Sequence, residues 1–460
     1  MAEPATAGSS DSLEAQIEQW RSYLRRRQAI RPVDVEELED HLRGQVAALR
    51  GAGLSEHEAF LVAVKRMGAL DAISNEFARE HSERLWKQLV IGSTGTDQPV
   101  HQARRETMVV FALAVAAGLA IKVPELFGRE WGRAGDEMFY ARNFSLFVLP
   151  LLIAYFVWKR RLNQRTWVWL ALAFAAAVVF ANVYPFQTGS DTEALTALHL
   201  PIALWLPVGI AYAGGRWGES AGRMDFVRFS GELFIYYALI ALGGGVLTAF
   251  TVGMFEAIGI DAEPVVEDWL PCGVLGAVIV GSWLVEAKQS VIENMAPVLT
   301  RLFTPLFTLA LLAFLGAMAW TGRGIDIERN ALIVFDLVLV LVLGLLLYSI
   351  SARDPQAQPG AFDLLLVLLL VSALIADAFA LAAIAARISE FGFTPNRVAA
   401  LGENVVLLGN LGWSTVLYVR FLRGRGTFAS LERWQTAYLP AYSIWAAFVV
   451  VGFPPLFGFD

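Results

Sequence analysis

The sequence predicts an all-α protein in which a small cytosolic helical module precedes a polytopic transmembrane helix bundle of about eleven spans. Of its 460 residues, 56% are hydrophobic and only 17% are charged, whereas soluble proteins are about 45–50% apolar and about 25% charged. The apolar excess is concentrated in runs of at least about 18 residues, the length that crosses a bilayer as a helix. The alternating segments of about ten residues that are typical of outer-membrane strands do not occur.

Composition also excludes several function classes. The net charge is −7 and no basic tract suited to nucleic acid occurs. The single cysteine, Cys272, excludes an intramolecular disulfide and a cysteine-based zinc site. The motifs of zinc proteases, P-loop enzymes, serine hydrolases and dinucleotide-binding enzymes are absent, so we expect no cofactor and no enzyme of these classes.

Four segments follow from the distribution of polar residues. Residues 1–10 are predicted to be a disordered tail, residues 11–90 a cytosolic helical module, residues 91–106 a linker, and residues 107–460 the multi-pass transmembrane domain. The N-terminus has no apolar region of a signal peptide. The first apolar run is therefore expected to act as an internal signal-anchor, with the preceding segment in the cytoplasm.

The module is predicted to contain four helices. Apolar residues at helical spacing indicate the first helix, over residues 13–24. Pro32 begins the second helix and Gly51 ends it. The string SEHE, residues 55–58, is a capping box that starts the third helix. The fourth helix is predicted over residues 70–90.

The module contains one pair of residues with the spacing of metal ligands. Glu37 and His41 are spaced i, i+4 and could hold a metal together with His57 or His81. No third ligand is fixed by spacing, so solvated helix faces are the favoured interpretation and no metal is expected.

The same region resembles a known module. The features that carry the resemblance are the runs E-L-E-D-H-L, G-L-S-E-H-E-A-F and R-M-G followed by E-F, within residues 36–80. They are similar to the permease-prefix domain, which is related to the helical signalling domains ahead of some bacterial membrane proteins. The resemblance implies a cytosolic accessory or regulatory role, with a possible cytosolic protein partner for residues 11–90, and it implies no catalysis.

The transmembrane domain is predicted to begin inside and end outside. The expected inner loops hold 16 Lys and Arg residues and the expected outer loops hold 8, and positive charge collects on the cytoplasmic side. Eleven apolar runs are the predicted spans: 107–123, 143–158, 166–184, 195–213, 229–254, 269–286, 298–320, 331–351, 361–386, 397–420 and 435–457.

The fifth span carries a ridge of small residues. Ala241, Gly245, Ala249 and Gly253 repeat every four residues, and such ridges let helix backbones approach closely in lipid. Helix packing is the favoured interpretation. A hinge at Gly243–Gly245 is the alternative.

The stretch RISEFGFTPNRVAAL, residues 387–401, separates two membrane-length runs and carries arginine where an outer loop disfavours it. Thr394 is predicted to cap the following helix, with Pro395 at its first position. Arg397 falls in the first turn, where the helix dipole opposes a cation. Arg387 closes the preceding helix, where the dipole favours it.

These charges predict a polar cluster in the outer half of the bundle. Arg397 is expected to pair with Asp377 or Asp336, because lone charges in lipid cost several kcal/mol. Static ion pairs, a ligand or ion site, and snorkelling at the lipid interface are the three interpretations. His199 could titrate near neutral pH or be a hydrogen-bonded helix residue. The predicted cluster consists of Asp336, Asp377, Arg387, Arg397, Glu403 and Asn404, with Asn410 nearby.

The hairpin also resembles a family motif. Arg387, Gly392, Thr394 and Arg397 match a helix ending in Arg-Ile that is followed by an aromatic-Gly-x-Thr-x-x-Arg turn. This motif is similar to that of a bacterial membrane family known as domain of unknown function 4153, over roughly residues 107–457. The resemblance implies a bacterial inner-membrane protein and supplies no activity.

Three functions remain open from the sequence. A regulatory or sensory membrane protein, with the cytosolic module as partner-binding element, ranks first. A secondary transporter or permease that uses the polar cluster ranks second, weakened by the lack of a visible inverted repeat. An intramembrane enzyme on a lipid-linked substrate ranks third, with Asp377 and Glu403 as its carboxylates.

Overall fold

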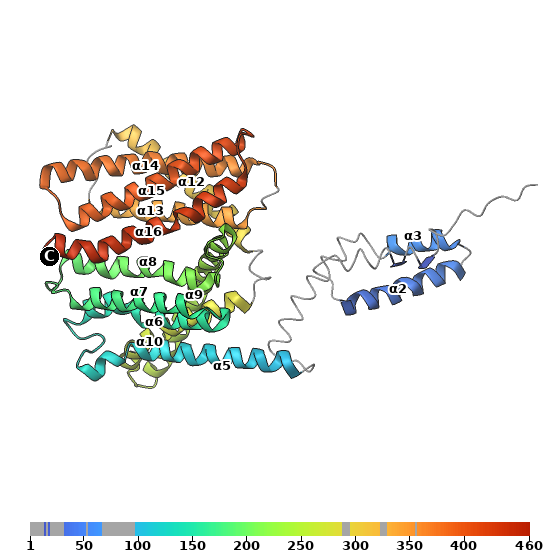
Figure 1. The fold of residues 1–460 in the computed structure, drawn as a ribbon, viewed down its shortest axis with the longest axis horizontal. Coiled ribbons are helices and arrows are strands. Elements are labelled where there is room, and N and C mark those ends of the chain that lie inside the picture. Colours follow the sequence, from blue (N-terminus) through green and yellow to red (C-terminus); the bar gives the residue numbers. More distant parts are fainter. Residues whose placement is uncertain are drawn as a thin grey trace, which may run out of the picture. The chain divides into compact units, whose positions relative to one another are not determined.

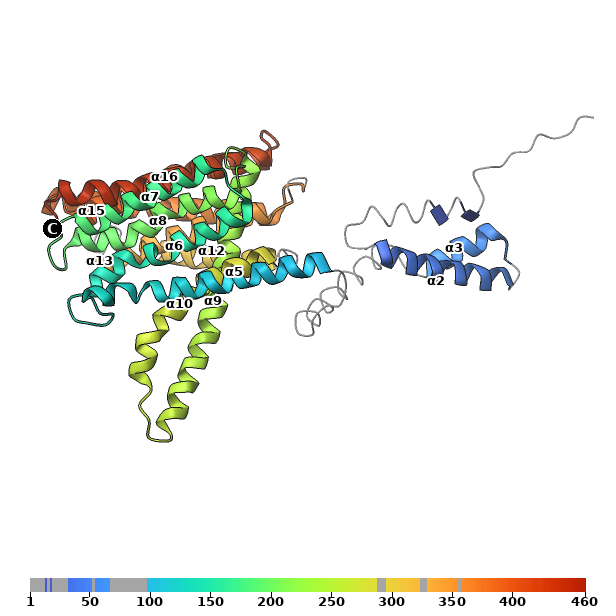
Figure 2. The same ribbon diagram turned by 60° about the horizontal axis from the view of Figure 1, so that its bottom comes forward.

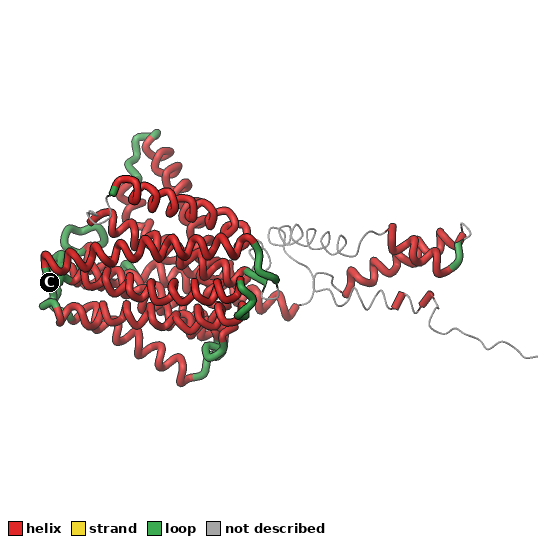
Figure 3. The backbone as a smooth tube through the Cα atoms, turned by 90° about the horizontal axis from the view of Figure 1, so that it is seen from above, coloured by secondary structure: helices red, strands yellow, loops and turns green. Residues whose placement is uncertain are grey.

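The computed structural model divides the chain into two compact units, residues 1–99 and 100–460, which are described separately. Figure 3 shows that the described part of the chain is built from helices and connecting loops, without strands. The structure describes residues 13–14, 17–18, 32–51, 54–66, 97–287, 295–322, 329–354 and 357–460.

The first unit contains two described helices, α2 (Pro32–Gly51) and α3 (Glu56–Arg66). The predicted capping box starts α3: Ser55 N donates to Glu58 Oε2 at 3.1 Å, and Glu58 N donates to Ser55 Oγ at 3.4 Å. The second and third predicted helices are thus confirmed. The predicted tail, most of the first helix and the fourth helix lie outside the described residues.

A small apolar core holds α2 and α3 together. Leu42, Val46 and Leu49 of α2 pack with Ala59, Phe60 and Ala63 of α3 and with Ile17. Arg43 donates to Glu14 Oε1 at 2.7 Å and to Glu39 Oε1 at 2.9 Å, which adds an ion-pair network to this core.

The second unit is a polytopic helix bundle. Among the described residues, eleven helices are long and apolar enough to cross a membrane, so the predicted number of spans is confirmed. Helix α5 begins at Asp97, within the predicted linker, and its candidate span begins at Arg104. The helices are α5 (Asp97–Ala120, extended by the 3₁₀ turn Val123–Phe127), α6 (Glu137–Arg160), α7 (Gln164–Val183), α8 (Asp191–Ala213), α9 (Ser220–Glu256), α10 (Glu263–Ala287), α12 (Met295–Thr321), α13 (Arg329–Ala352), α14 (Ala361–Phe391), α15 (Pro395–Leu422) and α16 (Phe428–Leu456).

Two apolar cores divide this bundle into two helix groups. The first group comprises α5 to α10 and the second comprises α12 to α16, to which the start of α9 also contributes. The groups meet where α8 packs along α16 and α15 (Figure 1). Leu195 of α8 joins Ala399 of α15 and Val449 and Phe453 of α16 in a small cluster at this junction.

The odd number of crossings puts the start of α5 and the chain end, Asp460, at opposite ends of the bundle (Figure 1). The end that holds Asp460 is called the C-terminal end below. There the chain end is tied to the α7–α8 connection: Gln187 N donates to Phe459 O at 3.2 Å and Thr192 N to Asp460 O at 3.1 Å. Helices α8, α13 and α15 all begin at this end.

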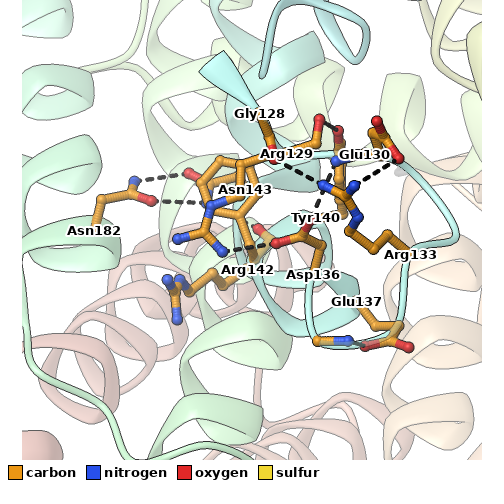
Figure 4. Close-up of polar contacts among 12 residues, drawn as sticks. Gly128, Arg129, Glu130, Arg133, Asp136, Glu137, Tyr140, Arg142, Asn143 and Asn182 are labelled. Atoms are coloured by element: carbon orange, nitrogen blue, oxygen red, sulfur yellow. Dashed lines mark hydrogen bonds and ion pairs between the residues drawn. The ribbon is translucent and has the colours of Figure 1, made fainter. Parts of the chain in front are cut away.

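The α5–α6 connection at the same end folds around one carboxylate (Figure 4). Asp136 accepts from Arg129 Nη1 at 2.7 Å and from Glu130 N at 3.1 Å, and the Tyr140 hydroxyl donates to Arg129 O at 3.1 Å. The guanidinium of Arg129 and the backbone N–H of Glu130 hold the pKa of Asp136 below its usual range, because both stabilise the ionised form.

Amide and charge pairs then join α6 to its neighbours. Asn143 and Asn182 exchange two hydrogen bonds, of 2.9 and 2.8 Å, between α6 and α7 (Figure 4). Arg142 of α6 forms an ion pair with Glu193 of α8. These contacts join the start of α6, the end of α7 and the start of α8 at the C-terminal end of the bundle.

The α9–α10 hairpin leans away from the other helices (Figure 2). The predicted packing ridge of Ala241, Gly245, Ala249 and Gly253 is exposed. A Cβ placed on Gly245 or Gly253 would meet nothing within 4 Å. The predicted packing role is therefore wrong within this chain, because the buried residues of α9 end at Leu233.

Close backbone approach occurs instead between α5 and α10. A Cβ on Gly118 would lie 2.7 Å from Cys272 O, and one on Gly276 would lie 3.0 Å from Ala114 O. Glycine is needed at both positions, because a side chain there would push the two helices apart.

Candidate functional site

Polar side chains lie inside the second helix group and at its contact with α8, in a part of the bundle that is otherwise apolar. They come from α8, α13, α14 and α15. We call them the polar seam, which consists of His199, Asp336, Asp377, Glu403 and Asn404.

The first part of the seam is a histidine–carboxylate pair that links the two groups. His199 of α8 is 1% exposed, and its Nε2 lies 2.5 Å from Oε1 of Glu403 on α15. Its Nδ1 lies 2.8 Å from Leu195 O, which can only accept, so Nδ1 carries a hydrogen. The Nε2–Oε1 contact therefore joins two groups that can each bind a proton.

The second part joins α15 to α13. Asn404, which is fully buried, donates from Nδ2 to Asp336 Oδ1 at 2.8 Å and to Ala400 O at 2.8 Å. Its Oδ1 is buried and has no hydrogen-bond partner among the described residues. Asn404 follows Glu403 directly in sequence, so the two parts of the seam meet on one turn of α15.

The third part is a carboxyl group without a hydrogen-bond partner. Asp377 of α14 is 0% exposed, and neither of its carboxyl oxygens has a partner among the described residues. Its buried neighbours on the helix are Ala373, Ala376 and Ala380. Asp336 of α13 lies nearby. Burying a polar group without a partner costs free energy, so this residue opposes stability.

The depth of the seam follows from helix geometry. His199 and Glu403 each lie about eight residues, or about 12 Å, from the start of their helices at the C-terminal end. Asp377 lies about 21 Å from the end of α14 at Phe391, near the middle of that helix. The Glu403 side chain is 32% exposed and Asp336 is partly exposed, whereas Asp377 is 0% exposed.

Arg397 does not belong to this site. Its Nη1 donates to Phe391 O at 3.1 Å and to Gly392 O at 2.9 Å, and its guanidinium lies over the Phe391 ring. The predicted pairing with Asp377 or Asp336 is wrong: the depth of Asp377 exceeds the reach of an arginine side chain, and the carbonyl groups that end α14 are closer. The cation is thus stabilised by the end of the neighbouring helix.

The predicted start of α15 is confirmed, whereas the prediction that Arg387 closes the preceding helix is wrong. Thr394 caps α15 by accepting from Arg397 N at 3.4 Å, and Pro395 is the first residue of the helix. Gly392 has φ of +79°, a conformation that favours glycine. Arg387 lies within α14, which continues to Phe391, and forms no ion pair with any described residue.

Asn410 belongs to a second buried network. It exchanges hydrogen bonds with Gln435 of α16, at 3.1 and 3.0 Å, and its Oδ1 accepts from Ser414 Oγ at 3.0 Å. All three side chains are fully buried. This network joins α15 to α16, and its polar atoms have their partners.

Sequence reasoning missed the contact between His199 and Glu403. A histidine within an apolar run was visible, but the pairing joins helices about 200 residues apart, and no spacing rule reaches that far. The candidate metal ligands of the first unit lie outside the described part of the chain: the side chains of Glu37, His41 and His57, and residue 81.

Fold and composition define the class: this is a multi-pass helical membrane protein. Searches with family models, among curated proteins and among solved structures found no match to the chain.

Proposed function

We propose that the bundle is a proton-coupled permease in which the polar seam takes up and releases a proton. The observation that carries the proposal is Asp377, a fully buried carboxyl group in mid-helix without a hydrogen-bond partner among the described residues. Ionisable residues inside a membrane are costly and commonly mark ion or proton pathways.

A proton fits the surroundings of Asp377 better than a larger cation does. A metal ion needs several oxygen ligands, whereas a proton needs only one oxygen atom. The His199–Glu403 contact adds two further groups that can bind a proton. The decrease in exposure from Glu403 to Asp377 supports a route between the bundle surface and the buried carboxyl group.

The contact of the polar seam with α8, across the boundary between the two helix groups, supports transport. In secondary transporters, coupling-ion sites lie near the bilayer midplane between two helix groups that rock against each other. The contact between His199 and Glu403 spans the two groups and would change when they move. We further propose that the C-terminal end faces outward in a bacterial inner membrane, from the 16 against 8 basic residues of the predicted loops.

The test is proton flux into proteoliposomes that contain a pH-sensitive dye, driven by an imposed potassium diffusion potential. We expect flux above that of protein-free vesicles, and its loss in Asp377→Asn. Glu137→Gln is the matched control: its carboxylate lies at the C-terminal end, outside the seam, and accepts from Gly135 N. Flux that is unchanged in Asp377→Asn would reject the proposal. A response to sodium alone would replace the proton by another cation.

A regulatory role of the first unit is the second candidate. The observation that favours it is the separate apolar core of α2 and α3, which forms without any membrane helix. The resemblance to the permease-prefix domain remains a prediction that agrees with this role. Affinity capture with full-length chain and with chain lacking residues 1–90 tests it: a cytosolic partner should be retained only by the full-length protein.

A further inference from the structure

A polar cavity lies at the end of the bundle opposite to the C-terminal end. Its volume is about 330 Å³. It lies where α6, α8 and α10 end and α9 begins. The lining side chains are Arg160, Tyr212, Arg216, Asp225, Arg228, Phe229, Glu232 and Val285.

The arginines of the cavity come from three different elements. Arg160 ends α6, donates from Nη2 to Glu286 Oε1 and Oε2 at 2.8 and 2.9 Å, and lies over the Tyr212 ring. Arg216, in the α8–α9 connection, donates to Asp225 Oδ2 at 3.1 Å. These partners orient the side chains, and each guanidinium has five N–H donors, more than its contacts use.

Arg228 completes the set from the first turns of α9. It donates from Nη2 to Ser351 O at 2.8 Å, and its Nη1 lies 3.9 Å from Asp225 Oδ1. The side chains of Arg216 and Arg228 are 55% and 40% exposed. Both can therefore turn N–H donors towards a ligand that enters the cavity.

We propose that this cavity binds a phosphodiester headgroup of a membrane lipid. Arginine forks match the oxygens of phosphate, and basic pockets between membrane helices bind anionic headgroups. The cavity lies at the ends of the membrane-length helices, which is the level of lipid headgroups. Arg160 is already paired with Glu286, so Arg216 and Arg228, the two more exposed arginines of the cavity, are the groups available to a phosphodiester.

The carboxylates narrow the choice of ligand. Asp225 and the buried Glu232 would repel a multiply charged phosphate monoester, and they would accept an ammonium group placed beside the phosphate. Phosphatidylethanolamine carries both groups, so it should bind better than phosphatidylglycerol or inorganic phosphate. This site lies apart from the polar seam and does not depend on the proposed permease function.

Native mass spectrometry of the full chain tests the proposal. The protein in detergent is titrated with phosphatidylethanolamine, phosphatidylglycerol, uncharged diacylglycerol and inorganic phosphate. We expect the two phospholipids to bind, with ethanolamine first, and Arg216→Ala/Arg228→Ala to weaken them about tenfold. The control Arg165→Ala removes an exposed arginine from the start of α7, at the same end of the bundle, and should bind lipid normally.

Each outcome decides between sources of the phosphate. Equal binding of diacylglycerol, or unchanged binding in the double variant, would overturn the site. Binding of inorganic phosphate as tight as that of phospholipid would identify a soluble phosphate compound instead of a lipid and reject the lipid assignment. If the double variant does not fold, Arg216→Gln alone changes the most exposed of the three arginines and should still weaken binding severalfold.

Discussion

Two aspartates on helix α14 should respond to the same substitution in opposite directions. Asp363 is 4% exposed and accepts from Arg353 Nε and Nη2, both at 3.0 Å. Asp363→Ala leaves that guanidinium, whose side chain is only 13% exposed, without its carboxylate, and breaking a largely buried ion pair costs about 3–5 kcal/mol. Asp377 is equally buried but has no hydrogen-bond partner among the described residues.

The expected change in the free energy of unfolding for Asp377→Ala is favourable. Removing an unpartnered buried polar group recovers about 1–3 kcal/mol, and alanine gains about 0.5 kcal/mol in helix propensity. A cavity of carboxylate size costs about 1 kcal/mol. Asp377→Ala should therefore stabilise the protein by about 1 kcal/mol, while Asp363→Ala destabilises it by several times as much.

The assay is thermal unfolding of the full chain in detergent, with the same buffer for every variant. Asp377→Ala should melt at or slightly above the wild-type temperature, and Asp363→Ala several degrees below it. Ser372→Ala is the control for buried polar residues on this helix, since its hydroxyl donates only to Leu368 O in the preceding turn. A drop for Asp377→Ala as large as that for Asp363→Ala would mean that Asp377 has a strong partner, and the reasoning would fail.

Three further predictions concern the ends and the interior of the bundle. Arg397→Ala should lower the free energy of unfolding by about 1 kcal/mol, because it loses only hydrogen bonds to the end of α14. In double-mutant cycles with the carboxylates of the polar seam, the changes in unfolding free energy should add, and non-additive changes would restore the rejected ion pair. The pKa of Asp136 is lowered, so the contacts of its carboxylate persist above the usual aspartate pKa of about 3.9 and are lost as the pH falls through the lower folded-state pKa. Hydrogen-exchange protection of the α5–α6 connection should therefore decrease as the pH falls. Protection that does not change with pH would contradict this prediction. Gly402→Ala places a Cβ 1.9 Å from the Trp445 ring, so it should lower the free energy of unfolding by about 1–3 kcal/mol and reduce the melting temperature. At Gly243 an added Cβ meets nothing within 4 Å, so Gly243→Ala should stabilise the protein. Equal melting temperatures for the two variants would refute the packing described.

The sequence was sufficient for the spans because their signal is local. Each apolar run of membrane length is a helix, and the local devices at Ser55 and Thr394 act as predicted. Helix ends were predicted less well. Helix α9 begins at Ser220 and α14 ends at Phe391, beyond the apolar runs, since polar residues continue a helix that hydropathy no longer marks.

Partners across the bundle could not be predicted for a different reason. Charge alone suggested that Arg397 should meet Asp377, but Arg397 contacts the end of α14 at Phe391, and Asp377 lies about 21 Å further along that helix. His199 and Glu403 meet because α8 and α15 pack side by side. The small residues of α9 have the spacing of a packing ridge, but they lie in the α9–α10 hairpin that leans away, and no other helix of this chain covers them. Such contacts depend on which helices are neighbours, and hydropathy does not contain that information.

The central claim is that Asp377 holds an exchangeable proton, and infrared difference spectroscopy during a pH titration tests it most directly. A protonated carboxyl group has its own C=O stretching band, which shifts when the proton is replaced by deuterium. We predict that the wild type shows such a band, that Asp377→Asn lacks it, and that Asp363→Asn, which changes the paired aspartate of the same helix, retains it. An Asp377→Asn spectrum identical to that of the wild type would contradict the account.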